Sequence, residues 1–263
     1  MRAYWSFVSA RFRMMLQYRA AAAAGFGTQL FWGLIRVMIF AAFYRSTAAR
    51  QPMTYEQVVT YVWLSQATFA LMPFGVDADV REMIRSGNVA YEMLRPLDLY
   101  GAWFCRALAW RAAATLLRAV PMFIVAGLFL GLQPPASVGA ALAWALATLM
   151  ALLLSCAMTS LSNISMLWTI SGQGVAQLLP TAVYFLSGMV IPLPLLPDWL
   201  QSALAVLPFR GIIDTPLRLY MGHIPLAEAA PAFASQAVWI LLLLAGGRAL
   251  LARGKRRLVI QGG

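Results

Sequence analysis

Few residues of this chain could do chemistry, and their types exclude several classes of enzyme. The 263-residue sequence has one histidine, His223, and two cysteines, Cys105 and Cys156, both in apolar surroundings typical of buried structural thiols. No spacing of these residue types predicts a metal site, and one histidine is not expected to complete a Ser/His/Asp arrangement. The sequence has no Gly-rich phosphate loop with a lysine, so we expect the chain not to hydrolyse nucleotide itself.

The only substantial hydrophilic stretch is residues 77–98, which mixes acidic and basic residues. Its first half has helix-like spacing, Ser86-Gly87-Asn88 predicts a helix stop, and Pro96 prevents a helix from continuing through the residue before it. A short amphipathic helix of this kind can sit in a groove of a soluble partner and transmit a rigid-body push. It can equally lie on lipid, and composition alone favours neither interpretation.

The 77–98 segment lies between apolar stretches that have the composition of membrane spans. Hydrophobic residues make up 62% of the chain and charged residues only 11%, whereas a soluble domain carries about 25% charged residues. No Asp, Glu, Lys, Arg or His occurs from Ala119 to Pro197, a run of 79 residues, and one spanning helix needs about 20. The sequence therefore predicts an all-α polytopic membrane protein.

Apolar runs predict a six-span transmembrane domain over residues 20–252. An amphipathic helix over residues 1–19 precedes it, and we expect this helix to lie in the membrane interface, although it could instead pack on another element. A basic tail, residues 253–263, follows. Six prolines interrupt residues 190–228, which predicts short surface or re-entrant helices in an extracellular hairpin before the last span. The predicted spans are residues 20–44, 55–76, 103–132, 136–160, 166–189 and 230–251.

The distribution of basic residues predicts the orientation of the chain. Fourteen Lys and Arg lie in the N-terminal segment, around residues 77–111 and in the C-terminal tail, whereas four lie in the loops on the other side. The positive-inside rule then places both termini and the 77–98 segment in the cytoplasm, with the chain in the cytoplasmic (inner) membrane. Because the basic residues flank apolar runs, the net charge of +11 does not predict nucleic-acid binding.

The ionisable groups within the predicted spans indicate whether the chain could drive transport by itself. Apart from Glu56 at the very edge of the second span, no carboxylate lies in a predicted span, although proton- and sodium-coupled carriers usually depend on such groups. We therefore expect another polypeptide to supply the energy. A self-contained secondary transporter or channel is the main alternative; a membrane-embedded enzyme and a pure assembly subunit are weaker ones. Arg36, alone in the first span, is expected to face the protein interior, a partner chain or a lipid head group.

Three features of the chain occur together in a known superfamily. After the second span the sequence reads Glu82-Met-Ile-Arg-Ser-Gly87 and then Leu94-Arg-Pro-Leu-Asp98. Before the last span it reads Leu186-Ser-Gly-Met-Val-Ile-Pro192, Leu196-Pro-Asp-Trp-Leu200 and Leu207-Pro-Phe209. Together with the layout of helices, these motifs resemble the permease subunits of the ABC-2 type exporter superfamily over nearly the whole chain.

The resemblance implies a dimer of permeases, identical or different, with interfaces at spans one and five and two cytoplasmic ABC ATPase subunits. ATP and Mg would be bound by those partners, so no cofactor and no catalytic residue is expected in this chain. The 77–98 segment would be the coupling helix, and the residues in contact with the ATPase would be Arg81, Glu82, Ile84, Arg85 and Gly87. The substrate would be an exported amphipathic molecule, such as a drug, lipid or glycolipid.

The external hairpin has two possible roles: it could gate the outer mouth of the pathway, or it could equally be a folded plug that only stabilises the dimer. The hairpin positions that match the superfamily pattern are Gly188, Pro192, Pro197, Trp199 and Pro208. Its charged residues, Asp198, Arg210, Asp214 and Arg218, are expected to be solvated loop charges rather than ligands.

Overall fold

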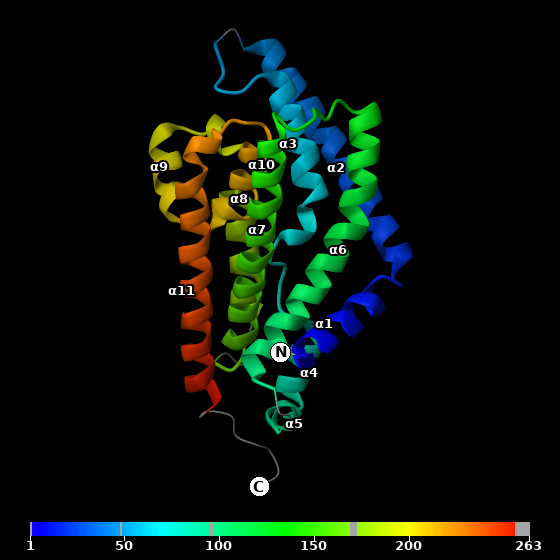
Figure 1. Ribbon diagram of the computed structural model, residues 1–263, viewed down its shortest axis with the longest axis vertical. Coiled ribbons are helices and arrows are strands. Elements are labelled where there is room, and N and C mark those ends of the chain that lie inside the picture. Colours follow the sequence, from blue (N-terminus) through cyan, green and yellow to red (C-terminus); the bar gives the residue numbers. More distant parts are fainter. Residues whose placement is uncertain (1, 48, 95–96, 169–172, 256–263) are drawn as a thin grey trace.

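The computed structural model describes residues 2–47, 49–94, 97–168 and 173–255, and their regular secondary structure is entirely helical. Most of the short helices lie near the two ends of the molecule, beside four long ones (Figure 1). The α-helices are α1 Arg2–Met15, α2 Arg19–Ser46, α3 Tyr55–Ala67, α4 Ala78–Arg85, α5 Val89–Met93, α6 Leu99–Phe129, α7 Val138–Ser165, α8 Gln173–Leu186, α9 Asp198–Val206, α10 Asp214–Tyr220 and α11 Ala229–Lys255. Four 3-10 helices are also present: η1 Phe69–Leu71, η2 Leu193–Leu195, η3 Phe209–Gly211 and η4 Leu226–Glu228.

Four helical stretches in the described residues are long and apolar enough to cross a membrane: Arg19–Ser46, Leu99–Phe129, Val138–Ser165 and Leu226–Lys255. They contain 28 to 31 residues, and a helix of about 20 already spans the hydrocarbon core. Each carries large apolar side chains on its outer surface, such as Phe31, Leu128, Leu142 and Leu241. This outward apolar surface is what a bilayer requires, so the chain is a multi-pass membrane protein.

The predicted second span is shorter than expected, because helix α3 ends at Ala67 rather than at residue 76. After η1 the chain continues without regular structure through Pro73 and Gly75, which has a φ of +60°. Proline and a left-handed glycine both disfavour helix continuation. Arg111 of α6 donates hydrogen bonds to the freed carbonyls of Ala70 and Met72, so these buried backbone acceptors are satisfied.

The predicted fifth span is only partly described. Helix α8 covers Gln173–Leu186, 14 residues with Pro180 inside, and residues 169–172 lie outside the described part of the chain. The segment predicted as an extracellular hairpin, residues 190–228, contains the short helices η2, α9, η3, α10 and η4, and its extracellular position stays a prediction. The predicted basic tail is described as far as Lys255, where α11 ends.

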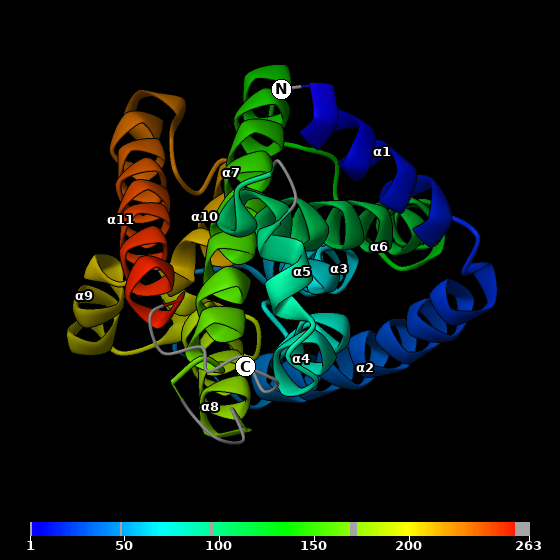
Figure 2. The ribbon, with the colours of Figure 1, turned by 90° about the horizontal axis from the view of Figure 1, so that it is seen from below.

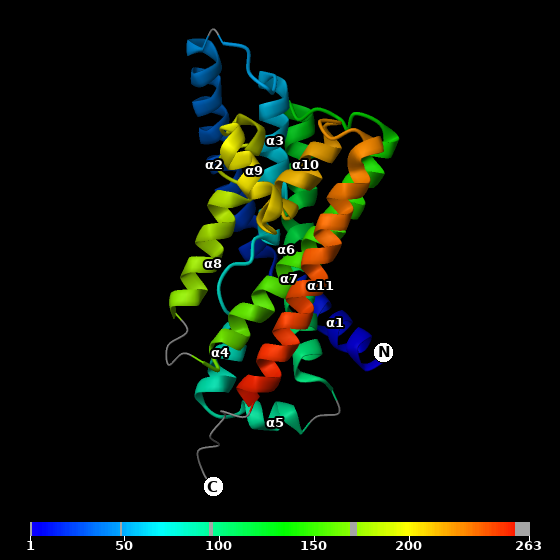
Figure 3. The ribbon, with the colours of Figure 1, turned by 90° about the vertical axis from the view of Figure 1, so that its left-hand side faces the viewer.

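Helix α3 occupies the centre of the molecule and contacts α2, α6 and α10. The main core joins buried residues of α3, α7 and α10, among them Tyr61, Leu154 and Leu217. Helices α7 and α11 pack side by side along their length (Figures 1 and 3). Helix α1 packs on the outside of α6, inclined to the long helices (Figure 2). Helix α1 lies within the segment predicted as an amphipathic helix, residues 1–19, and packs on α6; its place in the membrane interface stays a prediction.

Candidate functional site

The segment before α6 folds into α4 and α5 at one end of the molecule, here called the α4–α5 end (Figure 1). Helix α4 begins after Asp77, whose side chain accepts hydrogen bonds from the N–H of Asp79 at 2.9 Å and of Val80 at 3.3 Å. An aspartate here satisfies N–H groups that have no partner within the helix. The N–H of Asp77 itself donates to Asn163 Oδ1 of α7 at 3.0 Å. The start of α4 is therefore fixed to a long helix.

Two arginines from other helices bind the first turn of α4. Arg106 of α6 pairs with Asp79 at 2.5 Å and with Asp77 at 3.4 Å, and Arg11 of α1 pairs with Asp79 at 2.7 Å. The hydrogen bond from Arg11, aided by the charges of both arginines, lowers the pKa of the Asp79 carboxyl below its usual value. Asp79 is therefore ionised at neutral pH, and its ion pairs connect α4 to α1 and α6.

The inner face of the α4–α5 segment is apolar. Val80, Met83 and Ile84 are spaced so that they share one face of α4. Val80 and Val89 are fully buried, while Met83 and Ile84 pack against the same cluster. The remaining buried members of this cluster come from α6, α7 and α11: Leu99, Tyr100, Trp103, Ile164 and Leu251. Helix α4 therefore shares one buried apolar cluster with three long helices.

The predicted contact residues divide between the two faces of α4. Glu82 and Arg85 are exposed on the outer face, and neither side chain has a hydrogen bond or ion pair with a described residue. Arg81 lies at the margin and is half-buried, whereas Ile84 packs inward. Gly87 has a φ of +75° at the turn between α4 and α5, a conformation that favours glycine. Two of the five residues thus present charge to a partner, and contact with an ATPase stays a prediction.

The sequence interpretation missed three exposed apolar residues beside this charged face. Tyr91 is 70% exposed and Leu94 82%, with Met93 between them also exposed. Three large apolar residues within four positions of a hydrophilic segment are the signal that could have identified them. Arg95 and Pro96, which complete the predicted motif, lie outside the described residues. The surface formed by Glu82, Arg85, Tyr91, Met93 and Leu94 is called the α4–α5 surface below.

The predicted hairpin residues also fall into two groups. Gly188, Pro192 and Pro208 are buried, and Gly188 adopts a φ of +89°, so these residues shape the turns of the hairpin. Pro197 and Trp199 are exposed at the start of α9, Trp199 to 73%. They lie toward the end of the molecule opposite α4 and α5 (Figure 1).

One hairpin charge is not solvated, contrary to expectation. Asp214, at the start of α10, is only 1% exposed. It accepts a hydrogen bond from the Tyr61 hydroxyl of α3 at 3.2 Å and pairs with Arg218 at 3.6 Å. A buried carboxylate is stable only with such partners. The expectation was wrong because the partner on α3 is 153 positions away in the sequence.

Arg36 faces the protein interior, which was one of the three predicted environments. Its guanidinium donates to Ser65 Oγ of α3 at 2.9 Å and to the carbonyl oxygen of Val190 at 3.1 Å. An arginine in a spanning helix needs polar partners of this kind. Arg36 therefore joins α2 to α3 and to the first residue of the hairpin.

One comparison with known proteins identifies the family of this chain. Among the described residues, no group of three or more His, Cys, Asp or Glu side chains is placed to hold a metal ion. Comparison with curated proteins and with solved structures found no significant match in either set. A protein-family comparison matched residues 30–262, most of the chain, to the family described as ABC-2 family transporter protein. This multi-pass membrane protein therefore belongs to the ABC-2 transporter family.

Proposed function

We propose that this chain is the permease subunit of an ABC exporter, which forms the translocation pathway as a dimer and is driven by separate ATPase subunits. The proposal rests on how the α4–α5 segment of this ABC-2 family member is held on one face and exposed on the other. Its inner face is fixed to α1, α6, α7 and α11, while Glu82 and Arg85 are exposed without partners among the described residues. A helix that is firmly held on one side and free on the other is suited to receive a push from a soluble partner.

In this proposal the chain crosses the membrane six times, with α3 and α8 as the two shorter crossings. Helix α3 contains 13 residues, about 20 Å of helix, and is surrounded by protein instead of lipid. Broken helices are tolerated at membrane depth where protein shelters them. Both termini and the α4–α5 end face the cytoplasm, because basic residues concentrate there, and α1 lies in the membrane interface. The hairpin lies on the outer side of the cytoplasmic membrane.

The contacts of α4 suggest how the force is transmitted. An ATPase that moves toward or away from its partner on ATP binding would displace α4. The ion pairs of Asp79 carry this displacement to α1 and α6, and the buried cluster carries it to α7 and α11. The helices then tilt as a body, and the pathway between two permeases opens alternately to each side.

The proposed dimer contact lies on the side where α2 and α8 are both found (Figures 2 and 3). Helix α2 is the least buried of the four long helical stretches. Phe31, Trp32 and Met38 on α2, and Leu178 and Phe185 on α8, are exposed. A second copy of this chain or a different permease would cover these side chains.

A self-contained secondary transporter is the alternative function, and one observation favours it. Asp214 is a buried carboxylate, and groups of this type carry protons in coupled carriers. Asp214 is, however, paired with Arg218 and hydrogen-bonded to Tyr61. An acid neutralised by a fixed cation is a poor proton carrier, so the exporter is the better supported function.

Co-purification tests the proposal. The chain is expressed in its own cells and solubilised from native membranes, as wild type and as Glu82→Ala/Arg85→Ala. We expect wild type to retain an ATPase subunit and the double variant to lose most of it, because both exposed charges of the outer face are removed.

The matched control is Arg50→Ala/Glu56→Ala, which removes two exposed charges of the same signs at the opposite end. It should retain the ATPase as wild type does. A well-folded wild type that brings no ATPase would refute the exporter and favour the secondary transporter. Equal loss in both double variants would refute the assignment of α4 as the contact.

A further inference from the structure

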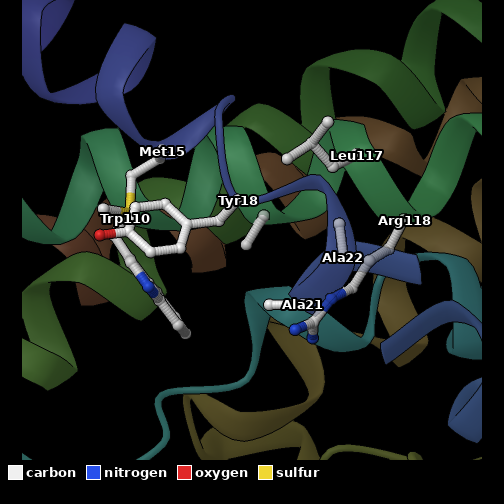
Figure 4. A pocket seen from close by; sticks show the side chains of 8 residues that line it. Met15, Tyr18, Ala21, Ala22, Trp110, Leu117 and Arg118 are labelled. Carbon is white, nitrogen blue, oxygen red and sulfur yellow. The ribbon is translucent and has the colours of Figure 1, made fainter. Parts of the chain in front are cut away.

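A cavity of about 300 Å³ lies between the α1–α2 connection and α6 (Figure 4). Arg118 on its wall belongs to Leu99–Phe129, one of the stretches long and apolar enough to cross a membrane. Most of its lining is apolar, with Met15 from α1, Ala21 and Ala22 from α2, and Leu117 from α6. The exception is Arg118 of α6, whose guanidinium lies beside Ala21 and Ala22 (Figure 4). The rings of Tyr18 and Trp110 lie away from the arginine, toward the other end of the cavity (Figure 4).

Arg118 has no partner among the described residues. It makes no hydrogen bond or ion pair with any of them, and its buried Nε is unsatisfied. Helices α1, α2 and α6 contain no acidic residue. Asp77 and Asp79, which line the neighbouring cavity, are already paired with other arginines. An arginine in a spanning helix is costly without a counter-charge, so we infer that its partner comes from outside the described residues.

The backbone of α2 makes room for this arginine. A Cβ added at Gly25 would lie 2.6 Å from Arg118 Nε and 2.7 Å from Cζ, closer than side-chain atoms can approach. The guanidinium therefore rests directly against the α2 backbone, and any larger side chain at position 25 would displace it from this place. This contact holds the charge at the wall of an otherwise apolar cavity.

The cavity continues toward the α4–α5 end. A second cavity of about 530 Å³ shares Met15, Tyr18 and Trp110 with the first and extends to Asp77 and Asp79. Side chains of a helix lean toward its N-terminus, and α6 begins at the α4–α5 end, so Arg118 leans toward that membrane surface. Tyrosine and tryptophan favour the level of the lipid head groups. The charge thus lies within reach of lipids in one leaflet.

We propose that this cavity binds an anionic phospholipid, with the lipid phosphate on Arg118 and an acyl chain along Leu117, Ala21 and Ala22. Guanidinium and phosphate form strong paired hydrogen bonds, and the apolar lining fits hydrocarbon. A free phosphate ion would find no such match, because the surrounding surface is apolar. The site does not depend on contact with an ATPase, so it can exist whether or not the proposed function holds.

Native mass spectrometry of the delipidated full chain tests the site. The probes are phosphatidylglycerol, diacylglycerol with the same chains, and inorganic phosphate. We expect wild type to bind phosphatidylglycerol at least about tenfold more tightly than diacylglycerol, and not to bind inorganic phosphate. Arg118→Gln should abolish the preference for phosphatidylglycerol, and Arg118→Lys should reduce it, because lysine keeps the charge but not the paired geometry.

Arg45→Gln is the matched control, since it removes an exposed arginine near the opposite end, and it should bind phosphatidylglycerol as wild type does. If Arg118→Gln fails to fold, Gly25→Leu keeps the arginine but fills the space in which it rests, and it should lose the same preference. Equal phosphatidylglycerol binding by wild type and by a folded Arg118→Gln or Gly25→Leu variant would overturn the proposal. Equal binding of diacylglycerol, or binding of inorganic phosphate, would overturn it too.

Discussion

Arg106 connects α4 to α6, and its removal should loosen α4 without unfolding the protein. The Arg106 side chain is only 11% exposed, whereas its partners Asp77 and Asp79 are 23% and 61% exposed. A hydrogen bond to a charged group contributes about 1.5–3 kcal/mol. Solvent screens the exposed carboxylate, and Arg11 still pairs with Asp79 in the variant. We therefore expect Arg106→Ala to destabilise the docking of α4 by about 1–2 kcal/mol.

Hydrogen–deuterium exchange of the purified chain measures this effect. A loss of about 1–2 kcal/mol corresponds to roughly 5- to 30-fold faster exchange of the α4 amides. Amides in the middle of α7, far from the ion pair, should exchange as in wild type. The matched variant Arg85→Ala removes an exposed arginine of α4 that has no partner among the described residues, so its α4 exchange should stay unchanged.

The two arginine variants also separate structure from partner binding. Arg85→Ala should weaken ATPase retention while leaving α4 exchange as it is, whereas Arg106→Ala should speed up α4 exchange. Unchanged α4 exchange in Arg106→Ala would refute the reasoning, because the ion pairs would then not hold the helix. Faster exchange spread evenly over all helices would refute it as well, because the loss would be global.

Three further predictions follow from the contacts, each read by thermal unfolding. A carboxylate whose pKa is lower in the folded protein stabilises the fold above its ordinary pKa, and this stabilisation is lost as the pH falls through the lowered pKa. The stability advantage of wild type over Asp79→Asn should therefore be constant near neutral pH and shrink below about pH 4. A stability advantage that grows on acidification would contradict this prediction. Gly33→Ala should lower the free energy of unfolding by about 1–3 kcal/mol, because its Cβ would overlap the ring of Trp63 on α3. Gly27→Ala, which has open space around it, should leave the stability unchanged. Equal effects of the two substitutions would contradict the close packing of Gly33 against α3. Asp214→Ala should cost about 1–3 kcal/mol, because the buried Tyr61 hydroxyl loses its acceptor and Arg218, which keeps its hydrogen bond to His223, loses its ion pair. A loss no larger than that of the exposed Asp198→Ala would contradict the role of Asp214.

The sequence predicted the helical membrane class and most of the long helices, because hydropathy over 20 or more residues is a local property. It also predicted the helix that became α4 and its stop at Gly87, since caps and left-handed glycines have local signals. The end of α3 at Ala67 was not predicted. Pro73 and Gly75 are local signals for that break, but the partner of the freed carbonyls is not: Arg111 reaches them from a helix about 40 positions later in the sequence.

The candidate site was harder to predict than the fold. Ile84 matched the family pattern and was expected in the partner contact, yet it packs inward, because helix orientation is decided by the apolar cluster on α6, α7 and α11. Asp214 was expected in solvent, and only its tertiary contact with Tyr61 explains its burial. A hydrogen bond between residues far apart leaves no trace in a single sequence.

Photo-crosslinking in the native cell tests the central claim, that a cytoplasmic ATPase binds the α4–α5 surface. Tyr91 and Trp199, 70% and 73% exposed toward opposite ends of the molecule, are each replaced by p-benzoylphenylalanine. The account predicts that position 91 forms an adduct with an ABC ATPase subunit and that position 199 forms none. An ATPase adduct at position 199, or none at position 91 in a folded protein, would contradict it.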